Sequence, residues 1–233
     1  MDDPRQPLPN PGAGLRIGRA AFLGTVAAGV AGIALGPRLS RMLGSGPTGL
    51  LGDLSAFTGG GWRIYAIESP LPRFDPVAYR LRVHGEVAHP LELDWQAVQG
   101  LPAVNQVSTF HCVTGWTVDG VRWHGVRGTA LMDMVKPTAR ARYVTFRSLE
   151  RSYVDQLTID QFALPDVMLA TLMNDAPISR DHGAPLRLVI PRMYGYKGVK
   201  WVDEIRFDAT PSPGYWEQNG YDVDAWVGHS NGL

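Results

Sequence analysis

Alternation of apolar and polar residues predicts several short β-strands in the second part of the chain. The predicted strands cover residues 79–87, 104–112, 142–148, 186–190 and 199–207. The run 186–190 is almost entirely apolar, as in a strand buried on both faces. Residues 119–120, an Asp-Gly pair between alternating flanks, predict a hairpin turn.

Short helices are predicted between these strands. Residues 93–98 form a helix capped by Asp94, and 130–136 form a helix capped by Thr129 and stopped by Pro137. The apolar run 166–174 also predicts a helix. Strands, short helices and long loops follow one another without a βαβ rhythm, a repeat or a Gly-rich nucleotide-binding motif. The fold class is therefore α+β, with mixed β-sheets and short helices.

The first sixty residues differ in composition from the rest. Residues 1–14 form a leader rich in Pro and Gly, residues 20–36 contain no charge, and 37–61 form a linker. The uncharged run lies between arginines and predicts a membrane-anchor or export-signal helix, with a buried helix of the globular domain as the alternative. The globular domain is predicted to span 62–233. We expect a membrane-anchored or exported protein on the extracytoplasmic face, with a cytoplasm-facing anchored domain as the alternative.

Charge and cysteine content exclude some classes of function. The chain has 22 basic and 22 acidic residues, which argues against a general nucleic-acid binder because such proteins carry a basic excess. Its single cysteine, Cys112, cannot form an internal disulfide. It lies in STFHCVTGWTVDG, residues 108–120. The residues alone leave an inert buried thiol, a nucleophile, a metal ligand and half of an intermolecular disulfide open.

A basic segment covers residues 187–200. It contains Arg187, Arg192, Lys197 and Lys200 and no acidic residue, in a chain whose net charge is zero. Gly195 and Gly198 interrupt it, and glycines allow main-chain N–H groups to approach an anion. The turn at 181–185 presents His182 close to Arg187 in sequence. The segment is either an anion-binding loop or a solvated basic surface.

Five motifs together resemble one family. They are His111-Cys112-Val113 with Trp116; 141–146, ARYVTF; 182–191, HGAPLRLVIP; 194–201, YGYKGVKW; and 213–217, PGYWE. In this order they resemble the molybdopterin-binding domain of the sulfite oxidase family, in the bacterial branch near the catalytic subunit of protein-methionine-sulfoxide reductase. The resemblance runs from about Trp62 to Gly220.

The resemblance implies a site. The cofactor would be molybdenum-molybdopterin, with Cys112 as the protein's thiolate ligand to the metal. The other residues implied in cofactor binding are Tyr65, Ser148, His182, Arg187, Gly198, Val199 and Lys200. His111 and Tyr196 are candidates for handling substrate or protons because they lie near these motifs in sequence.

The family's known chemistry implies a molybdenum-dependent oxidoreductase that transfers an oxygen atom and two electrons to or from a small substrate, such as a sulfoxide or sulfite. An arginine that sulfite oxidases carry is absent from 66–72, AIESPLP, and Thr114 replaces the glutamate of the reductases. We expect a separate electron-transfer partner, such as a membrane cytochrome. The alternatives are a membrane-tethered binding module without catalysis, and a cysteine hydrolase using Cys112 with His182 and either Asp181 or Asn174.

Overall fold

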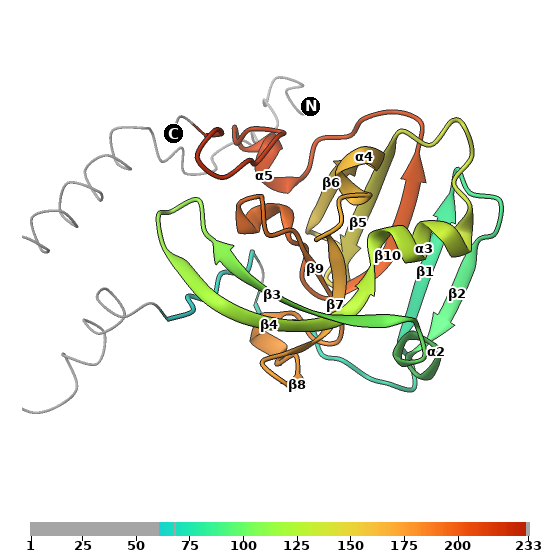
Figure 1. Cartoon of the computed structure of the whole chain (residues 1–233), viewed down its shortest axis with the longest axis horizontal. Helices are drawn as coiled ribbons and strands as arrows, with labels where there is room; N and C mark the ends of the chain where they lie inside the picture. Colours follow the sequence, from blue (N-terminus) through green and yellow to red (C-terminus); the bar gives the residue numbers. More distant parts are fainter. Residues whose placement is uncertain (1–60, 68, 232–233) are drawn as a thin grey trace, which may run out of the picture. The chain divides into compact units, whose positions relative to one another are not determined.

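The computed structural model describes residues 61–67 and 69–231 of the chain (Figure 1). The predicted leader, the 20–36 helix and almost all of the linker lie outside these residues. No helix in the described part of the chain is long and apolar enough to cross a membrane.

The first β-sheet has five strands in the order β2-β1-β10-β5-β6. Its strands are β1 (Arg80–Gly85), β2 (Leu91–Asp94), β5 (Tyr143–Ser148), β6 (Val154–Thr158) and β10 (Val202–Asp208). The strands β1 and β10 are parallel, and the other neighbours are antiparallel. This sheet is therefore mixed, as the α+β prediction requires.

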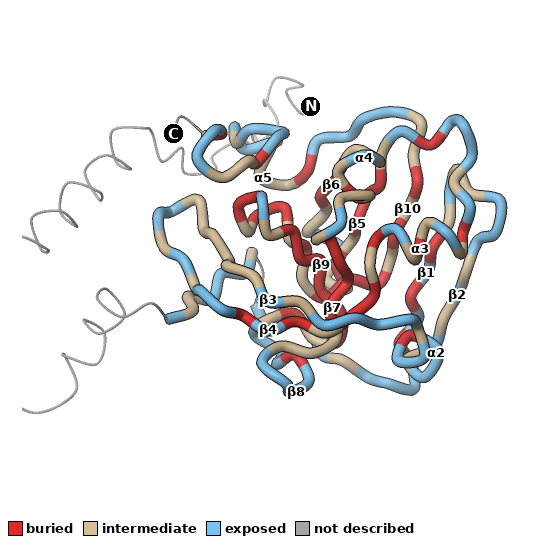
Figure 2. Tube along the Cα trace, in the orientation of Figure 1, coloured by how far each residue is buried: buried red, intermediate tan, exposed pale blue. Residues whose placement is uncertain are grey.

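The second sheet is antiparallel and carries the segments of greatest chemical interest. Its strands are β3 (Ala103–His111), β4 (Thr117–Arg127), β7 (Met168–Met173), β8 (Ala176–Pro177) and β9 (Arg187–Val189). They follow the order β3-β4-β7-β8, and β9 also pairs with β7. Figure 2 shows that β7 and β9 are largely buried, whereas the edge strand β3 is exposed along much of its length.

Helical segments are short and connect the strands. They are α2 (Trp95–Gln99), α3 (Gly128–Val135), α4 (Ile159–Phe162), α5 (Tyr215–Gln218), and the 3₁₀ turns η2 (Arg180–His182) and η3 (Gly195–Lys197). The Asp94 side chain caps α2 by accepting from Ala97 N–H, as predicted. Thr129 does not cap α3, because that helix begins at Gly128 and Arg127 takes the N-cap position without a side-chain bond.

The core joins both sheets through the buried faces of their strands. Leu81 and Val83 of β1 alternate with exposed neighbours, as the sequence pattern predicts. Phe146 of β5, Phe162 of α4 and Phe207 of β10 stack edge to face in the same core. Burying each such side chain contributes about 1.5–3 kcal/mol, which gives the site above it a rigid base.

The run 166–174 contains the strand β7, Met168–Met173, and not the predicted helix. Leu169 packs in one core cluster and Met168 and Ala170 in the other, so both faces of β7 are buried, while β4 and β9 pair with its edges. A strand covered on both faces produces a continuous apolar run, and Met, Leu and Ala are also good helix formers. The composition therefore favoured a helix, and the pairing with two neighbouring strands determined the outcome.

The predicted hairpin turn at Asp119-Gly120 is also wrong. These residues lie inside β4, at a register irregularity opposite Thr109, whose hydroxyl donates to the Asp119 carboxylate at 2.8 Å. The chain turns instead between Cys112 and Trp116, where Gly115 has a φ of 89°. A turn at this point allows the nine-residue strand β3 to pair along its full length with β4.

Candidate cofactor and active site

Cys112 directly follows strand β3 and opens the turn to β4. Its N–H donates to Trp116 O at 2.9 Å, and its carbonyl accepts from Gly115 N–H at 3.0 Å. The thiol is half-buried and lies 3.1 Å from the Thr114 hydroxyl. The turn therefore fixes the main chain of Cys112 and leaves its sulfur accessible.

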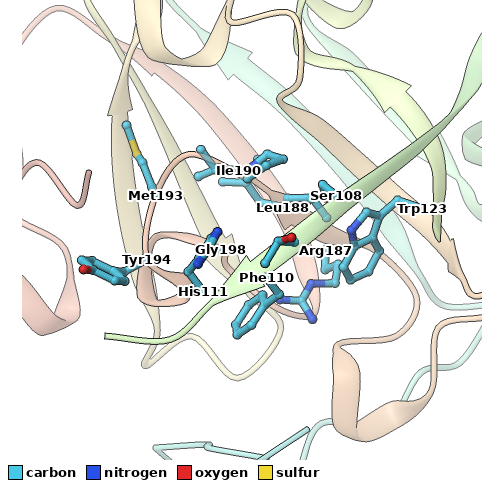
Figure 3. Close-up of a pocket in the computed structure, with 14 residues that line it drawn as sticks. Ser108, Phe110, His111, Trp123, Arg187, Leu188, Ile190, Met193, Tyr194 and Gly198 are labelled. Carbon is cyan, nitrogen blue, oxygen red and sulfur yellow. The ribbon is translucent and has the colours of Figure 1, made fainter. Parts of the chain in front are cut away.

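A pocket beside this turn is lined by residues from β3 and from the basic segment (Figure 3). Phe110 and His111, the two residues before Cys112, line it together with Arg187 and Gly198. The Arg187 guanidinium carbon lies 5.7 Å from the centroid of the Phe110 ring and 5.2 Å from that of Trp123. The pocket thus brings Arg187 and Gly198 of the basic segment beside the two residues that precede Cys112.

Arg187 is a buried cation with few partners. It is 4% exposed, donates to His182 O at 3.0 Å, and leaves its Nε–H without an acceptor. It makes no ion pair with any described residue. Burial lowers the pKa of Arg187 to about 10. Such a guanidinium is stabilised when an anion enters the pocket.

Lys200 and His182 extend this positive region. The Lys200 ammonium donates to Tyr65 O at 2.6 Å and to Asp181 O at 3.3 Å. Burial, followed by repulsion from Arg187, lowers the pKa of Lys200 to about 8. Burial, Arg187 and Lys200 also lower the pKa of His182. Three basic groups, of which Arg187 lowers the pKa of both others, form a site suited to a polyanion.

The main chain brings these groups together. Gly183 has a φ of 107°, and a Cβ at this residue would lie 2.8 Å from the Cβ of Lys200, so only glycine allows the two segments to approach so closely. Trp201 Nε1 donates to Arg180 O at 2.7 Å and holds the η2 turn in place. The close packing of η2 on Lys200 therefore depends on Gly183.

Two of the four basic residues of the 187–200 segment form ion pairs with acidic residues. Arg192 pairs with Asp166 at 2.8 Å. Lys197 is 1% exposed and pairs with Asp155 and Glu217. The sequence segment has no acid of its own, but strands and helices elsewhere supply them. Only Arg187 and Lys200 remain without an ion pair within the described residues.

Gly198 and Val199 connect the two cations. Val199 is fully buried in the core and its carbonyl accepts from Leu188 N–H at 2.9 Å. A Cβ at Gly198 would lie 3.0 Å from Leu188 O and 3.7 Å from Arg187 Nη2. The segment therefore exposes main chain at Gly198, while Val199 anchors it.

Tyr65 and Ser148 lie near the same region in different ways. Tyr65 is 55% exposed and stacks on Trp116 with ring centroids 6.5 Å apart, while its carbonyl accepts from Lys200. Ser148 is fully buried at the end of β5, and its hydroxyl has no partner. The next residue, Leu149, donates to Trp201 O at 2.8 Å, which places Ser148 close to Lys200 in the fold.

Tyr196 is tied to the end of the described chain. Its hydroxyl donates to Asp222 O at 2.8 Å and accepts from Asn231 Nδ2 at 3.0 Å. Asp222 N–H in turn donates to Asn231 Oδ1 at 3.0 Å, and Asn231 N–H donates to the Asp222 carboxylate. The Tyr196 hydroxyl therefore holds the 221–231 segment in place.

Tyr221 was not among the residues predicted from the sequence motifs. This half-buried residue packs on the Tyr196 ring at 5.2 Å and on the Trp216 ring at 5.1 Å. Burial raises the pKa of Tyr221, and the negative charge of a Cys112 thiolate raises it further, which places the phenol in the electrostatic range of that sulfur. The only sequence signal was its position five residues after Trp216 of the last motif.

A set of aromatic rings also surrounds the pocket. Trp62 packs on Phe110 at 4.7 Å and on His182 at 4.8 Å, and it lies within 6.3 Å of the Trp116 and Trp123 rings. Trp62 and Trp116 are half-buried at the pocket.

Comparison with known proteins identifies the family of this domain. Residues 68–216 match the oxidoreductase molybdopterin-binding domain family. The chain belongs to this family. It is an oxidoreductase, and its cofactor is molybdenum-molybdopterin, as the sequence predicted.

Curated relatives of this oxidoreductase come from bacteria and plants. It is 36% identical over 155 residues to "Uncharacterized oxidoreductase YuiH" of Bacillus subtilis, covering 65% of this chain and 77% of that protein. It is 34% identical over 145 residues to the protein-methionine-sulfoxide reductase catalytic subunit MsrP of Xanthomonas campestris, covering 55% of this chain and 44% of that protein. It is 30% identical over 187 residues to sulfite oxidase of Arabidopsis thaliana, covering 65% and 48%. The chain thus spans about half the length of the last two.

The solved structure of the sulfane dehydrogenase SoxCD from Paracoccus pantotrophus shares this fold. The TM-score is 0.55 at 20% sequence identity, with 61% of this chain and 41% of that chain covered. The oxidoreductase therefore has the sulfite oxidase-type fold predicted from its motifs.

The described residues fit an anionic pterin cofactor. Several buried donors lack partners, and they come from the strands and turns at the pocket and from the nearby end of β5. They are Ser108 Oγ, Trp116 Nε1, Trp123 Nε1, Ser148 Oγ and Arg187 Nε. Buried polar atoms without partners are rare in folded proteins, and a ligand rich in acceptors would satisfy such donors.

Proposed function

We propose that Cys112 binds the molybdenum of the cofactor and that the enzyme transfers one oxygen atom and two electrons to or from a small substrate. One observation carries this proposal. The only thiol of the chain follows two residues that line the pocket of the buried, unpaired Arg187. A thiolate is a soft ligand suited to a metal that is already bound by sulfur.

The remaining residues would hold the cofactor and exclude water. When bound, the molybdenum centre supplies the oxygen-atom and electron transfer. Arg187 and Lys200 neutralise the anionic end of the pterin, with His182 and the main chain at Gly198 beside them. The stacked rings of Tyr65 and Trp116 would cover the solvent side of the cofactor. Tyr221 is our candidate hydrogen-bond donor to substrate, because a phenol is protonated at neutral pH and the raised pKa of Tyr221 extends this to higher pH.

We propose a neutral sulfoxide or N-oxide as the substrate class in preference to sulfite. The segment that follows Tyr221 exposes two carboxylates, Asp222 and Asp224. Residues 66–72 contain no arginine to attract an anion. Negative charge on this segment disfavours an anionic substrate relative to a neutral one of similar size.

We also propose that a separate protein exchanges electrons with this enzyme. With one cysteine, the chain has no Cys-x-x-Cys-His segment for haem attachment. The uncharged run 20–36 supports an anchored or exported protein with a membrane-associated partner, such as a cytochrome, on the extracytoplasmic face.

Metal and pterin analysis of the full chain, produced in a host that synthesises molybdopterin, tests the proposal. The native protein is expected to contain molybdenum and pterin in near-equal amounts. Cys112→Ser is expected to keep the pterin, since Arg187 and Lys200 remain, but to lose or alter the metal centre. Thr114→Ser is the matched control, because it keeps the hydroxyl beside the thiol.

Two outcomes separate the parts of this proposal. Unchanged molybdenum content and an unchanged metal absorption spectrum in Cys112→Ser would exclude the thiolate ligand. Reduction of dimethyl sulfoxide with reduced methyl viologen, against oxidation of sulfite with ferricyanide, then tests the substrate class. Faster turnover of sulfite would contradict the preference for a neutral substrate.

A further inference from the structure

Lys197 is the cation of a buried charged triad behind the active site. Its ammonium lies 2.5 Å from Asp155 Oδ1 and also contacts Glu217 Oε1. The side chains of Lys197, Asp155 and Glu217 are 1%, 1% and 2% exposed. They come from η3, β6 and α5, so one buried cation joins three separate elements. The proposed chemistry uses none of them.

The triad carries one positive group and two carboxyl groups. If both carboxyls were ionised, the interior would hold an uncompensated negative charge, which is costly in a medium of low dielectric constant. Glu217 uses both oxygens, since Oε1 accepts from Lys197 and Oε2 accepts from Gly214 N–H at 2.5 Å. Asp155 Oδ1 accepts from Lys197 and from Gln156 N–H at 2.7 Å, but Asp155 Oδ2 has no partner. Oδ2 is therefore the atom on which a proton would reside.

The surroundings of Asp155 favour that proton. Burial raises the pKa of Asp155 to about 7, with the Lys197 charge opposing the rise and the Glu217 charge adding to it. The other titratable groups near it are the phenols of Tyr153 and Tyr196, both with pKa values raised mainly by burial. The Tyr153 hydroxyl donates to Tyr196 O. No other cation pairs with Asp155 in the described chain.

The triad is connected to the active site through both of its outer elements. Lys197 follows Gly195 and Tyr196 in η3, and Gly195 packs so closely on Phe110 that a Cβ would lie 2.2 Å from its ring. Glu217 lies in α5, and Tyr221 N–H donates back to Trp216 O of the same helix at 3.1 Å. The triad thus joins the loop that lines the pocket to the segment that carries Tyr221.

We propose that Lys197, Asp155 and Glu217 form a positioning triad that locks η3 to α5, and that a proton held on Asp155 keeps the triad neutral in the working enzyme. The positioning role rests on the proposed reaction at Cys112. The protonated carboxyl does not, because it is a property of the folded chain. When Asp155 loses its proton, the interior gains a negative charge, the tie between η3 and α5 loosens, and Tyr221 is held less firmly.

Infrared spectroscopy of the full chain with cofactor bound tests the proton. The native protein is expected to show the carbonyl stretch of a buried carboxylic acid that disappears as the pH rises between about 5 and 9. Asp155→Asn is expected to lack this band. The exposed residue Asp160, five positions later, provides a matched control, since Asp160→Asn should leave the band unchanged.

Glu217→Gln gives a sharper test of the charge balance. It removes one of the two carboxylates, so Asp155 and Lys197 become a simple ion pair and Asp155 should ionise at a pH lower by more than about one unit. The infrared band is then expected to be absent at neutral pH. A band that persists at neutral pH in Glu217→Gln would show that Asp155 is not coupled to the triad.

Hydrogen exchange of the peptide around residues 214–224 tests the positioning role without turnover. The intrinsic rate of amide exchange rises with pH in any peptide. Above neutral pH, the exchange rate of this peptide in the native protein should rise more steeply than the intrinsic rate. In Asp155→Asn this additional rise should be absent. The kcat for dimethyl sulfoxide should fall in parallel in the native enzyme. A native protein without the infrared band, or identical exchange profiles in the two proteins, would overturn the proposal. If Cys112→Ser retains its metal centre unchanged, the proposed role of Cys112 is wrong. The infrared and exchange measurements still test the triad in that case, because they do not depend on turnover.

Discussion

The Lys200 ammonium donates to the main-chain carbonyl of Tyr65 at 2.6 Å, although 135 positions separate the two residues in sequence. The same ammonium lies 4.2 Å from the Trp201 ring centroid. Because the bond uses the carbonyl and not a carboxylate, it orients Lys200 without neutralising its charge. Lys200 thus secures the 61–67 segment and remains available to an anion.

Retention of the cofactor should depend on pH through Lys200. The pKa of Lys200 is lowered to about 8, so below this pH the residue is cationic and attracts the anionic cofactor. As the pH rises above 8 that attraction is lost, and pterin content after prolonged dialysis should fall. Lys200→Met should lower retention about 10-fold or more at neutral pH and abolish the dependence. Lys200→Arg should retain the cofactor at alkaline pH, and equal losses from all three proteins would contradict this role.

Arg187 should show opposite effects on stability and on cofactor binding. Replacing this buried, unpaired cation with methionine removes a desolvation cost, so the free energy of unfolding of cofactor-free Arg187→Met should rise by about 1 kcal/mol or more. Its pterin content should fall sharply. Denaturant unfolding and pterin analysis on the same preparations measure both effects. A variant that is less stable and still loaded with pterin would show that Arg187 is a structural residue.

Tyr221→Phe should reduce turnover without unfolding the protein. The phenol hydroxyl has no hydrogen-bond partner among the described residues, so its removal should change the free energy of unfolding by less than about 0.5 kcal/mol. The loss of a donor beside the reacting centre should lower kcat for dimethyl sulfoxide by about 100-fold. Tyr143→Phe in β5 is the control and should have no effect on kcat. Equal kcat values for native protein and Tyr221→Phe would remove Tyr221 from the site.

We expect the Trp62 ring to hold the 61–67 segment over the pocket. Trp62→Ala removes a ring that contacts Phe110 and His182, and it should accelerate cofactor release and expose the pocket to solvent. Trp62→Phe preserves part of the ring contact and should behave almost like the native protein. The release rate can be followed by the fluorescence of the liberated pterin. Identical release rates in Trp62→Ala and native protein would mean that this ring contributes nothing to retention.

Local sequence patterns predicted those parts of the fold in which short-range physics dominates. The alternation in β1, the Asp94 cap of α2 and the strand leading to Cys112 were confirmed, because each depends on neighbours within a few residues. The helix predicted over 166–174 was wrong, since the pairing of β7 depends on two distant strands. The Asp119-Gly120 turn was wrong for a similar reason, because a longer pairing of β3 with β4 was available.

In the site too, local motifs identified candidate residues, whereas contacts between distant segments could not be predicted. The motifs singled out Cys112, Arg187 and Lys200, and in the fold Arg187 lines a pocket together with the two residues that precede Cys112; the roles of all three stay predictions. Sequence alone could not show that Lys197 points inward, because its acidic partners Asp155 and Glu217 lie 42 and 20 positions away in sequence. Tyr221 was not predicted, because no motif near it in sequence indicates that its segment folds back onto the domain. The assigned roles of His111 and Ser148 stay predictions.

The bonds between Asp222 and Asn231 have a practical consequence for anyone who handles this enzyme. They fasten the 221–231 segment to the Tyr196 hydroxyl, and the Tyr196 ring packs against that of Tyr221. An antibody, an affinity tag or a docked protein that grips this segment would therefore perturb the reaction centre itself. Attachments to this segment are expected to affect catalysis, so labels intended to be silent belong elsewhere, for example at the exposed residue Glu92 of β2.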